Sequence, residues 1–264
     1  MDTTIEARFR PLLETISDTG LDREIEAPAA LRMDTADYRG KRIDVAWAPF
    51  DHVNPSARIV IVGITPGRQQ MANALHEYRR HLHTEQDPPA ALAAAKVHAS
   101  FSGPMRTNLV AMLDDIGVAQ LLGVASTGAL WGSAAHLAHF TSALRYPVLL
   151  DGRNYAGTPG MLSVPLLRAQ LETHLAAEMR ALPDAIYVPL GPKVGEALAW
   201  LAPRVGIPDD RILTGLPHPS GASAERVAYF LRRKPRALLS AKTNAERLDA
   251  ARAALLGKIR ILGA

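Results

Sequence analysis

The chain of 264 residues contains no cysteine, few aromatic residues and no long apolar run. The absence of cysteine excludes disulfide bonds, thiolate nucleophiles and every zinc or iron–sulfur site that cysteine would hold. Acidic residues and glycines interrupt the longest apolar stretch, residues 109–130, which is not typical of a membrane span. The first ten residues are polar and lack the apolar segment of an export signal. We therefore expect a soluble cytoplasmic protein without a membrane partner.

Charge of one sign is in small excess, with 30 basic and 26 acidic side chains and a net charge of +4. Such a surplus permits nucleic-acid binding without demanding it. A hydrophobic content of 48% provides enough apolar side chains for a core and argues against wholesale disorder. The sequence contains no internal repeat and no obvious linker. We therefore predict a single domain over residues 1–264 and a monomer.

Strand patterns alternate with helix patterns about four times along the chain. The predicted strands are Arg42–Trp47, Arg58–Gly63, His139–Leu144, Ala185–Leu190 and Arg211–Leu216. The predicted helices are Ile5–Ile16, Gln70–His81, Pro89–His98, Pro104–Ile116, Leu166–Leu182, Pro192–Leu201, Ala222–Arg233 and Asn244–Leu256. This alternation predicts an α/β fold in which helices cover both faces of a mostly parallel sheet. The N-terminal helix lies within about residues 1–40.

The positive charge is concentrated at the C-terminus. From Glu225 onward there are ten basic and only three acidic side chains, a surplus of seven. The predicted helical extension over about residues 225–264 is therefore basic. Either it presents an ordinary solvated helix face, or it faces nucleic-acid phosphates.

Two loops follow predicted strands and combine glycine, proline and polar residues. Gly63–Arg68 reads G-I-T-P-G-R and follows the strongest strand, whereas Pro217–Ser223 reads P-H-P-S-G-A-S and follows the last one. Ligands of open parallel sheets bind beyond the carboxyl ends of the strands, so both loops are candidate ligand sites. Neither matches the dinucleotide, P-loop or nucleophile-elbow motifs, and we predict no cofactor.

These loops resemble motifs of the uracil-DNA glycosylase superfamily. G-I-T-P-G is similar to the G-I-N-P-G of the mismatch-specific glycosylases, and H-P-S-G-A-S resembles both N-P-S-G-L and H-P-S-P-L of other branches. Phe101–Gly103 with the following helix, Phe140–Pro147 and Tyr187–Gly191 resemble segments of the thermostable iron–sulfur branch. The resemblance runs in order from about Arg58 to Phe230. Because all cysteine ligands are absent, no iron–sulfur cluster is expected.

The resemblance implies a three-layer α/β/α sandwich around a mostly parallel four-stranded sheet. It also implies hydrolysis of the bond that joins a deaminated or damaged base to deoxyribose, after the base has been flipped into a pocket. The partner is then DNA, either double- or single-stranded. The implied catalytic residues are Thr65, which positions water, and His218, which stabilises the departing base. The implied base-binding residues are Gly63, Ile64, Phe101 and Ser142. The implied DNA-binding residues are Pro66, Gly67, Arg68, Pro219, Ser220, Gly221, Arg232 and Arg233.

Three residues depart from the family pattern. A threonine hydroxyl at Thr65 can hold water but cannot accept its proton near neutral pH. Ser142 lacks the donor and acceptor pair with which asparagine reads uracil. Ala222 replaces the bulky leucine that would enter the duplex. Two alternatives therefore stay open: a weakly active or inactive nucleic-acid-binding module, and an enzyme that acts on a small nucleoside-like ligand.

Two further signals receive simpler interpretations. Histidines at positions 76, 81 and 83, and at 136 and 139, lack the converging carboxylates of a metal site, so we predict no metal. The loop Asn154–Gly160 either lines the ligand pocket or merely turns the chain.

Overall fold

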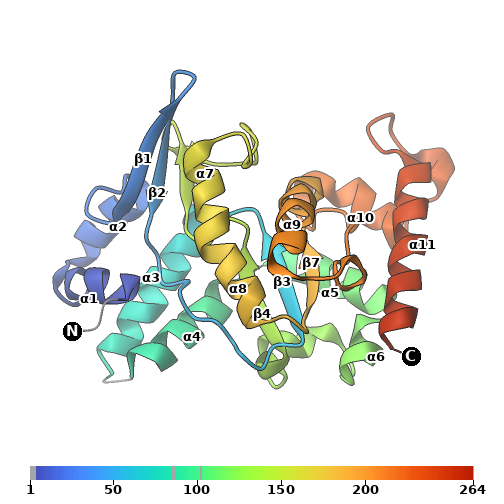
Figure 1. Cartoon of the computed structure of the whole chain (residues 1–264), viewed down its shortest axis with the longest axis horizontal. Helices are drawn as coiled ribbons and strands as arrows, with labels where there is room; N and C mark the ends of the chain where they lie inside the picture. The colour runs from blue at the N-terminus through green and yellow to red at the C-terminus, as the bar shows by residue number, and fades with distance from the viewer. Residues whose placement is uncertain (1–3, 85–86, 102, 264) are drawn as a thin grey trace. The chain divides into compact units, whose positions relative to one another are not determined.

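The structure is a computed structural model that describes residues 4–84, 87–101 and 103–263 (Figure 1). Contacts divide the chain into two compact units whose segments interleave. Unit 1 comprises Met1–Asn54, Ile64–Ser100 and Phe140–Glu178, and unit 2 comprises Pro55–Gly63, Phe101–His139 and Met179–Ala264. The number of domains stays a prediction. None of the helices formed by the described residues combines the length and apolar character that crossing a membrane requires.

Strand β3 (Ile59–Gly63) consists of β-branched residues followed by glycine, and every one of its residues is buried. It pairs in parallel with β7 (Ile186–Pro189) and is the central strand of a three-stranded sheet in the order β4-β3-β7, where β4 is Ala138–Ser142. Burial on both faces explains the continuous apolar run, which is typical of parallel strands. The predicted strands at these three positions are confirmed.

The predicted fourth parallel strand, Arg211–Leu216, is wrong. Only Ile212 forms a parallel bridge, to Tyr187 of β7, and the Leu213 amide donates to the Tyr187 carbonyl at 2.8 Å. A short helical turn, Asp209–Arg211, precedes the bridge, and Gly215 adopts a φ of +115°. Both depart from extended backbone, so the apolar alternation does not propagate into a ladder.

Unit 1 contains a second sheet, and this one is antiparallel. Its strand order is β1-β2-β5-β6. The strand bounds are Arg32–Tyr38, Lys41–Ala46, Val148–Leu150 and Arg153–Asn154. Arg39 and Gly40 both have positive φ, as the tight turn between β1 and β2 requires. The α/β class is confirmed, but the single, mostly parallel four-stranded sheet is wrong, because the sequence signal of β1, β5 and β6 was too polar or too short.

The helices of unit 1 agree with the periodicity, with one exception near the N-terminus. Their bounds are α1 Ile5–Thr15, α2 Asp18–Glu26, α3 Arg68–Leu82, α4 Pro88–Ala99 and α7 Pro165–Gln170. A π-helical turn, Leu171–Leu175, joins α7 to α8 (Ala176–Ala181), which extends into unit 2. The predicted N-terminal helix Ile5–Ile16 is confirmed as α1, and a second helix that was not predicted follows it, capped by the serine at position 17.

The helices of unit 2 include the basic C-terminal extension (Figure 1). Their bounds are α5 Pro104–Asp115, α6 Val118–Leu122, α9 Pro192–Val205, α10 Ala224–Phe230 and α11 Ala245–Leu262. Helix α9 begins with proline at its first position and ends at Gly206 in the left-handed conformation, as helix-termination rules predict. Most of the segment between α10 and α11 is not helical.

Gly215 provides a test of how α11 packs in unit 2. A Cβ atom at this position would lie 2.9 Å from the Ala251 Cβ of α11, whereas a Cβ at Gly206 would meet nothing. Both glycines have positive φ. We expect Gly206→Ala to lower the free energy of unfolding by about 1 kcal/mol and Gly215→Ala by at least about 1 kcal/mol more. Urea unfolding measures both variants, and an equal loss of unfolding free energy in the two would contradict the close packing of Gly215 against α11.

Candidate active site

The residues predicted for the site fall in both units. Ile64, Thr65, Pro66, Gly67, Arg68 and Ser142 belong to unit 1, whereas Gly63, Phe101, Pro219, Ser220, Gly221, His218, Arg232 and Arg233 belong to unit 2. Gly63 is the last residue of β3, and Ser142 is the last residue of β4. These positions are the carboxyl ends of strands, where open α/β sheets bind ligands. Ser102, part of the Phe101 motif, lies outside the described residues.

The Thr65 hydroxyl is engaged within unit 1. It donates to the Tyr146 carbonyl at 2.8 Å and accepts from the Val148 amide at 3.0 Å. The neighbouring Ile64 carbonyl accepts from the Leu144 amide at 2.9 Å. The loop after β3 is therefore joined to residues 144–148. One lone pair of the Thr65 oxygen remains, so this hydroxyl can accept a hydrogen bond from water but has no proton left to give.

Arg68 is also engaged by unit 1. Its amide donates to the Asn154 side chain at 3.1 Å, and its guanidinium donates to the carbonyls of Glu26 and Gly152. A Cβ at Gly67 would lie only 3.3 Å from the Asn154 amide nitrogen. Asn154 thus holds the start of α3, and the predicted place of its loop in the ligand pocket stays a prediction. If the guanidinium of Arg68 contacts DNA, as its implied DNA-binding role suggests, it must first release these two carbonyls.

Ser142 lies beside an unpaired polar group. Ser142 and Thr141 are both buried, and among the described residues the Thr141 hydroxyl finds no hydrogen-bond partner. Buried hydroxyls are nearly always hydrogen-bonded, so an orphan group at a strand end suits a site that receives a ligand or water.

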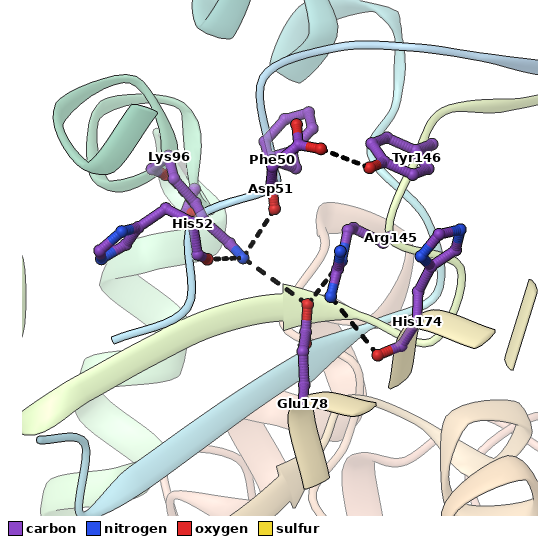
Figure 2. Close-up of polar contacts among 9 residues, drawn as sticks. Phe50, Asp51, His52, Lys96, Arg145, Tyr146, His174 and Glu178 are labelled. Atoms are coloured by element: carbon purple, nitrogen blue, oxygen red, sulfur yellow. Dashed lines mark hydrogen bonds and ion pairs between the residues drawn. The ribbon is translucent and has the colours of Figure 1, made fainter. Parts of the chain in front are cut away.

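A cluster of buried charges in unit 1 includes Lys96, Arg145 and Glu178 (Figure 2). Lys96 of α4 donates to the carbonyls of Phe50 at 2.9 Å and His52 at 2.6 Å. Its ammonium lies 3.9 Å from the Glu178 carboxylate of α8, to which the Arg145 guanidinium donates at 2.7 Å. Glu178 thus faces two cations, and each charge that folding removes from water has a partner.

Asp51 connects this cluster to the Thr65 loop. It accepts from the Tyr146 hydroxyl at 2.6 Å and from the Trp47 indole at 3.1 Å. Tyr146 also provides the carbonyl that accepts from Thr65, and its ring packs edge-on against His174 at 5.1 Å between centroids. The Tyr146 side chain and backbone therefore join the two sets of polar groups.

Burial shifts the pKa values of these groups. It raises the pKa of Asp51, although the Tyr146 hydroxyl and Arg145 oppose that change. Burial, with Arg145 as the second cause, lowers the pKa of His174 to about 4, so this histidine is neutral at pH 7. Burial lowers the pKa of Lys96 from 10.5 to about 8, although Glu178 opposes it. Perturbed groups of this kind gather at functional sites and in structural ion networks alike.

In unit 2, the His218 ring is half-buried in its proline-flanked loop. The Ser220 amide donates to His218 Nδ1 at 3.3 Å, which assigns the proton of the neutral ring to Nε2. Burial lowers the pKa of His218 below 6.5 and keeps the ring neutral at pH 7. Gly191 has a φ of +92°, and a Cβ there would lie 3.6 Å from the ring. His218 is therefore a neutral donor backed by a glycine.

The same unit holds Phe101 in a strained conformation. Phe101 is buried and has a φ of +49°, which is unusual for an aromatic residue. Gly103, also at positive φ, is the N-cap of α5, and Asn108 of α5 donates to the Pro219 carbonyl at 2.9 Å. Helix α5 therefore supports the His218 loop, while the backbone of Phe101 stores strain of the kind found at ligand sites.

The remaining predicted residues of unit 2 differ in exposure. Pro219 is buried, Ser220 is half-buried and Gly221 is exposed. Arg232 and Arg233 follow α10 and are exposed, and Arg232 donates to Asp115 at 3.0 Å. Their predicted role toward DNA stays a prediction.

Sequence reasoning missed the charge cluster of unit 1. Lys96 is the one basic residue before His98 in the alanine-rich helix α4, and Glu178 stands among apolar residues of α8. The sequence signal that could have revealed the cluster was a charged residue among the apolar residues of a helix. Arg145 and Tyr146 lie in a motif that was identified, but the resemblance assigned no role to their side chains. Within the described residues, no group of three metal-ligating side chains converges.

Comparison with known proteins yields one relative of substantial length. The protein YoxB of Bacillus subtilis (strain 168), described as uncharacterized, is 32% identical over 200 residues, which cover 75% of this chain and 78% of YoxB. The chain belongs to the YoxB family. No family model matches this chain, and no solved structure matches it.

The Thr65 hydrogen bonds give one testable consequence. Thr65→Val would leave the Tyr146 carbonyl and the Val148 amide without this partner, and we expect a loss of about 1–3 kcal/mol in the free energy of unfolding. Thr65→Ser keeps the hydroxyl and should lose less than half as much. Urea unfolding measures both variants, and equal losses would show that the hydroxyl does not support this loop.

The lowered pKa of Lys96 predicts a pH dependence of stability. Between pH 8 and 10 the unfolded chain keeps a proton on this lysine that the folded chain has released, so stability rises with pH. We expect a rise on the order of 1–3 kcal/mol in wild type, absent from Lys96→Met. The exposed Lys193→Met is the control and should keep the rise. A Lys96→Met profile parallel to wild type would contradict the prediction.

Proposed function

We propose that the chain hydrolyses the N-glycosidic bond of a deaminated or damaged base in DNA, as a divergent member of the uracil-DNA glycosylase superfamily. The proposal includes the three-layer arrangement of that family and a cytoplasmic monomer without a cofactor. The sheet order β4-β3-β7 with the Ile212 bridge beside β7 supports it, because the motif-bearing loops follow β3 and the segment of that bridge.

The neutral His218 carries the proposal. When the bond between base and sugar breaks, the base leaves with the bonding electrons and negative charge grows on its carbonyl oxygen. A hydrogen bond from Nε2–H of a half-buried, neutral ring stabilises that charge more than water does. The Ser220 amide, which occupies Nδ1, holds the required tautomer. Water then adds to the sugar carbon, and its proton passes to solvent.

The other implied groups support substrate binding. Phe101 would stack on the flipped base, and its strained backbone is consistent with a position selected for its ring. Ser142 would offer a polar contact at the end of β4. Thr65 would hold the water through its remaining lone pair. Because Ala222 is small and exposed, single-stranded or weakened duplexes are the more accessible substrates.

One observation favours a second candidate, a nucleic-acid-binding module without cleavage. Both hydrogen bonds of the Thr65 hydroxyl go to backbone groups of unit 1, so no side chain of the loop after β3 accepts the proton of water. This candidate binds DNA in a salt-dependent manner through the C-terminal basic residues and releases no base.

A base-release panel tests the proposal. Oligonucleotides that carry uracil, hypoxanthine or xanthine, single- and double-stranded, are incubated with wild type, His218→Ala and the exposed His98→Ala. We expect release by wild type and His98→Ala, and a rate about 10²–10³ times lower for His218→Ala. Release from none of these substrates would refute the glycosylase and leave the binding module.

The pKa of His218 predicts the pH dependence of that rate. Protonation of Nδ1 removes the acceptor of the Ser220 amide and disturbs the loop. Because the pKa of His218 lies below 6.5, we expect a constant rate from pH 7 to 8.5 and a decline only at acidic pH. A rate that increases steadily as the pH falls below 6 would contradict the role of a neutral ring.

A further inference from the structure

Unit 2 contains a pocket lined by residues of α10, α11 and the segment after α10, and neither His218 nor Phe101 is among these residues. Its volume is about 460 Å³, within the range of small-molecule sites. Phe230, Leu248 and Leu256 contribute apolar lining, and four cationic side chains line the same pocket. In Figure 1, α10 and α11 lie beside each other at the C-terminal end of the chain. A pocket with this lining suits a ligand that is part apolar and part anionic.

Arg232 can turn from its present partner to an anion. Asp115 accepts one hydrogen bond from Arg232 and two from Arg252, at 3.0 and 2.8 Å. One carboxylate therefore serves two guanidiniums. The Arg232 side chain is 69% exposed, whereas that of Arg252 is 18% exposed. Asp115 keeps its two-pronged bond with Arg252 when Arg232 moves, so the movement leaves no carboxylate unpaired.

Lys234 is similarly available. Its partner Glu225 also accepts from the Ser240 amide, the Ser240 hydroxyl and the Thr243 hydroxyl. These donors hold the carboxylate without the lysine. Arg236 pairs with Glu246 in an exposed ion pair, which is weak in water. Arg232, Lys234 and Arg236 can thus bind a phosphate with little loss of their existing interactions.

The backbone at Arg232 provides an independent observation. The Arg232 amide donates to the Tyr229 carbonyl and the Arg233 amide donates to the Ala228 carbonyl, both at 2.8 Å. This pair of bonds is the Schellman motif, in which glycine normally occupies the left-handed position. Here arginine occupies it with a φ of +59°. Strain at a position where glycine would fit better is consistent with a function of the side chain.

Tyr229 supplies an aromatic surface for the same pocket. Its hydroxyl donates to Asp249 of α11 at 2.9 Å, which restricts the ring. Restricted aromatic rings beside cations are the usual means by which proteins hold unpaired nucleotides: bases stack on the ring, and cations bind the phosphates.

We propose that this pocket binds one nucleotide of single-stranded DNA, with the base against Tyr229 and the phosphate at Arg232 and Lys234. The choice of DNA rests on the proposed function. A free nucleoside monophosphate has the same chemistry, and the experiment distinguishes the two sources.

Fluorescence anisotropy with a labelled 12-residue thymidine oligonucleotide tests the proposal in the full chain. Arg232→Gly removes the cation and relieves the strain, so it should raise Tm while weakening binding about tenfold. The slope of log affinity against log salt should fall by about 0.7, the value for one phosphate of a single strand. Arg39→Gly is the matched control, because Arg39 also has positive φ, at +52° in the β1–β2 turn. It should raise Tm and leave binding unchanged.

Two further arms identify the ligand. Tyr229→Leu should weaken binding of the thymidine strand about fivefold or more and leave an abasic strand of equal length unaffected. Competition by thymidine monophosphate against wild type, but not against Arg232→Gly, would show that the pocket also accepts the free nucleotide. Failure to compete, with the strand still dependent on Arg232, would assign the pocket to the strand alone.

The proposal is overturned if Arg232→Gly binds DNA as tightly as wild type, or if Arg39→Gly weakens binding equally, which would reveal only an effect of total charge. Equal weakening of the thymidine and abasic strands by Tyr229→Leu would also overturn it. Base release is measured separately. A chain that binds through Arg232 and releases no base refutes the proposed reaction alone, whereas release without this dependence refutes the pocket alone.

Discussion

Strand β3 must pair its backbone on both edges because all five of its residues are buried, and this requirement organises much of the chain. A buried peptide group that lacks a hydrogen bond is strongly unfavourable, so β3 needs neighbours from distant parts of the sequence. β7 provides one of them, from more than a hundred residues downstream. The bonds continue past the strand, where the Ile186 amide donates to the Arg58 carbonyl and the Leu190 amide to the Val62 carbonyl. The loops that follow β3 and β7 are consequences of this pairing.

In unit 1, the loop that contains Thr65 is connected by hydrogen bonds to buried charged residues from other segments of the chain. Thr65 depends on the backbone of Tyr146, whose hydroxyl depends on Asp51. Beyond them, Lys96 and Arg145 both pair with the Glu178 carboxylate, and Lys96 also donates a hydrogen bond to the Phe50 carbonyl. Each of these buried charges depends on its partners, because removal of one partner leaves an unpaired buried charge. The chemistry available at Thr65 is correspondingly narrow: its oxygen can accept from water, and its proton is already committed.

How far the sequence predicted the structure depended on the kind of signal. β3 was evident because four consecutive β-branched residues before glycine have few other interpretations. Ile212 was misleading because apolar residues between two turns have the pattern of a strand whether or not a ladder extends along them. β1 and β5 were not predicted, because a polar edge strand and a three-residue strand show no detectable alternation of apolar and polar residues. The two motif loops were found from residue types, whereas Lys96 and Glu178 were not, because only folding brings α4 and α8 together.

The sequence by itself determined the α/β class, the positions of most helices, the absence of cysteine chemistry and the concentration of positive charge after Glu225. These properties are local or compositional, and periodicity, turn residues and counts express them directly. The tertiary structure alone decided that the strands form two sheets and that the Thr65 hydroxyl is hydrogen-bonded to the backbone. It also decided that Asp115 accepts from two arginines and that Glu225 accepts from four donors. Each of these depends on which distant groups compete for the same hydrogen bond or charge. That competition is settled by three-dimensional proximity, which no pattern of neighbouring residues records.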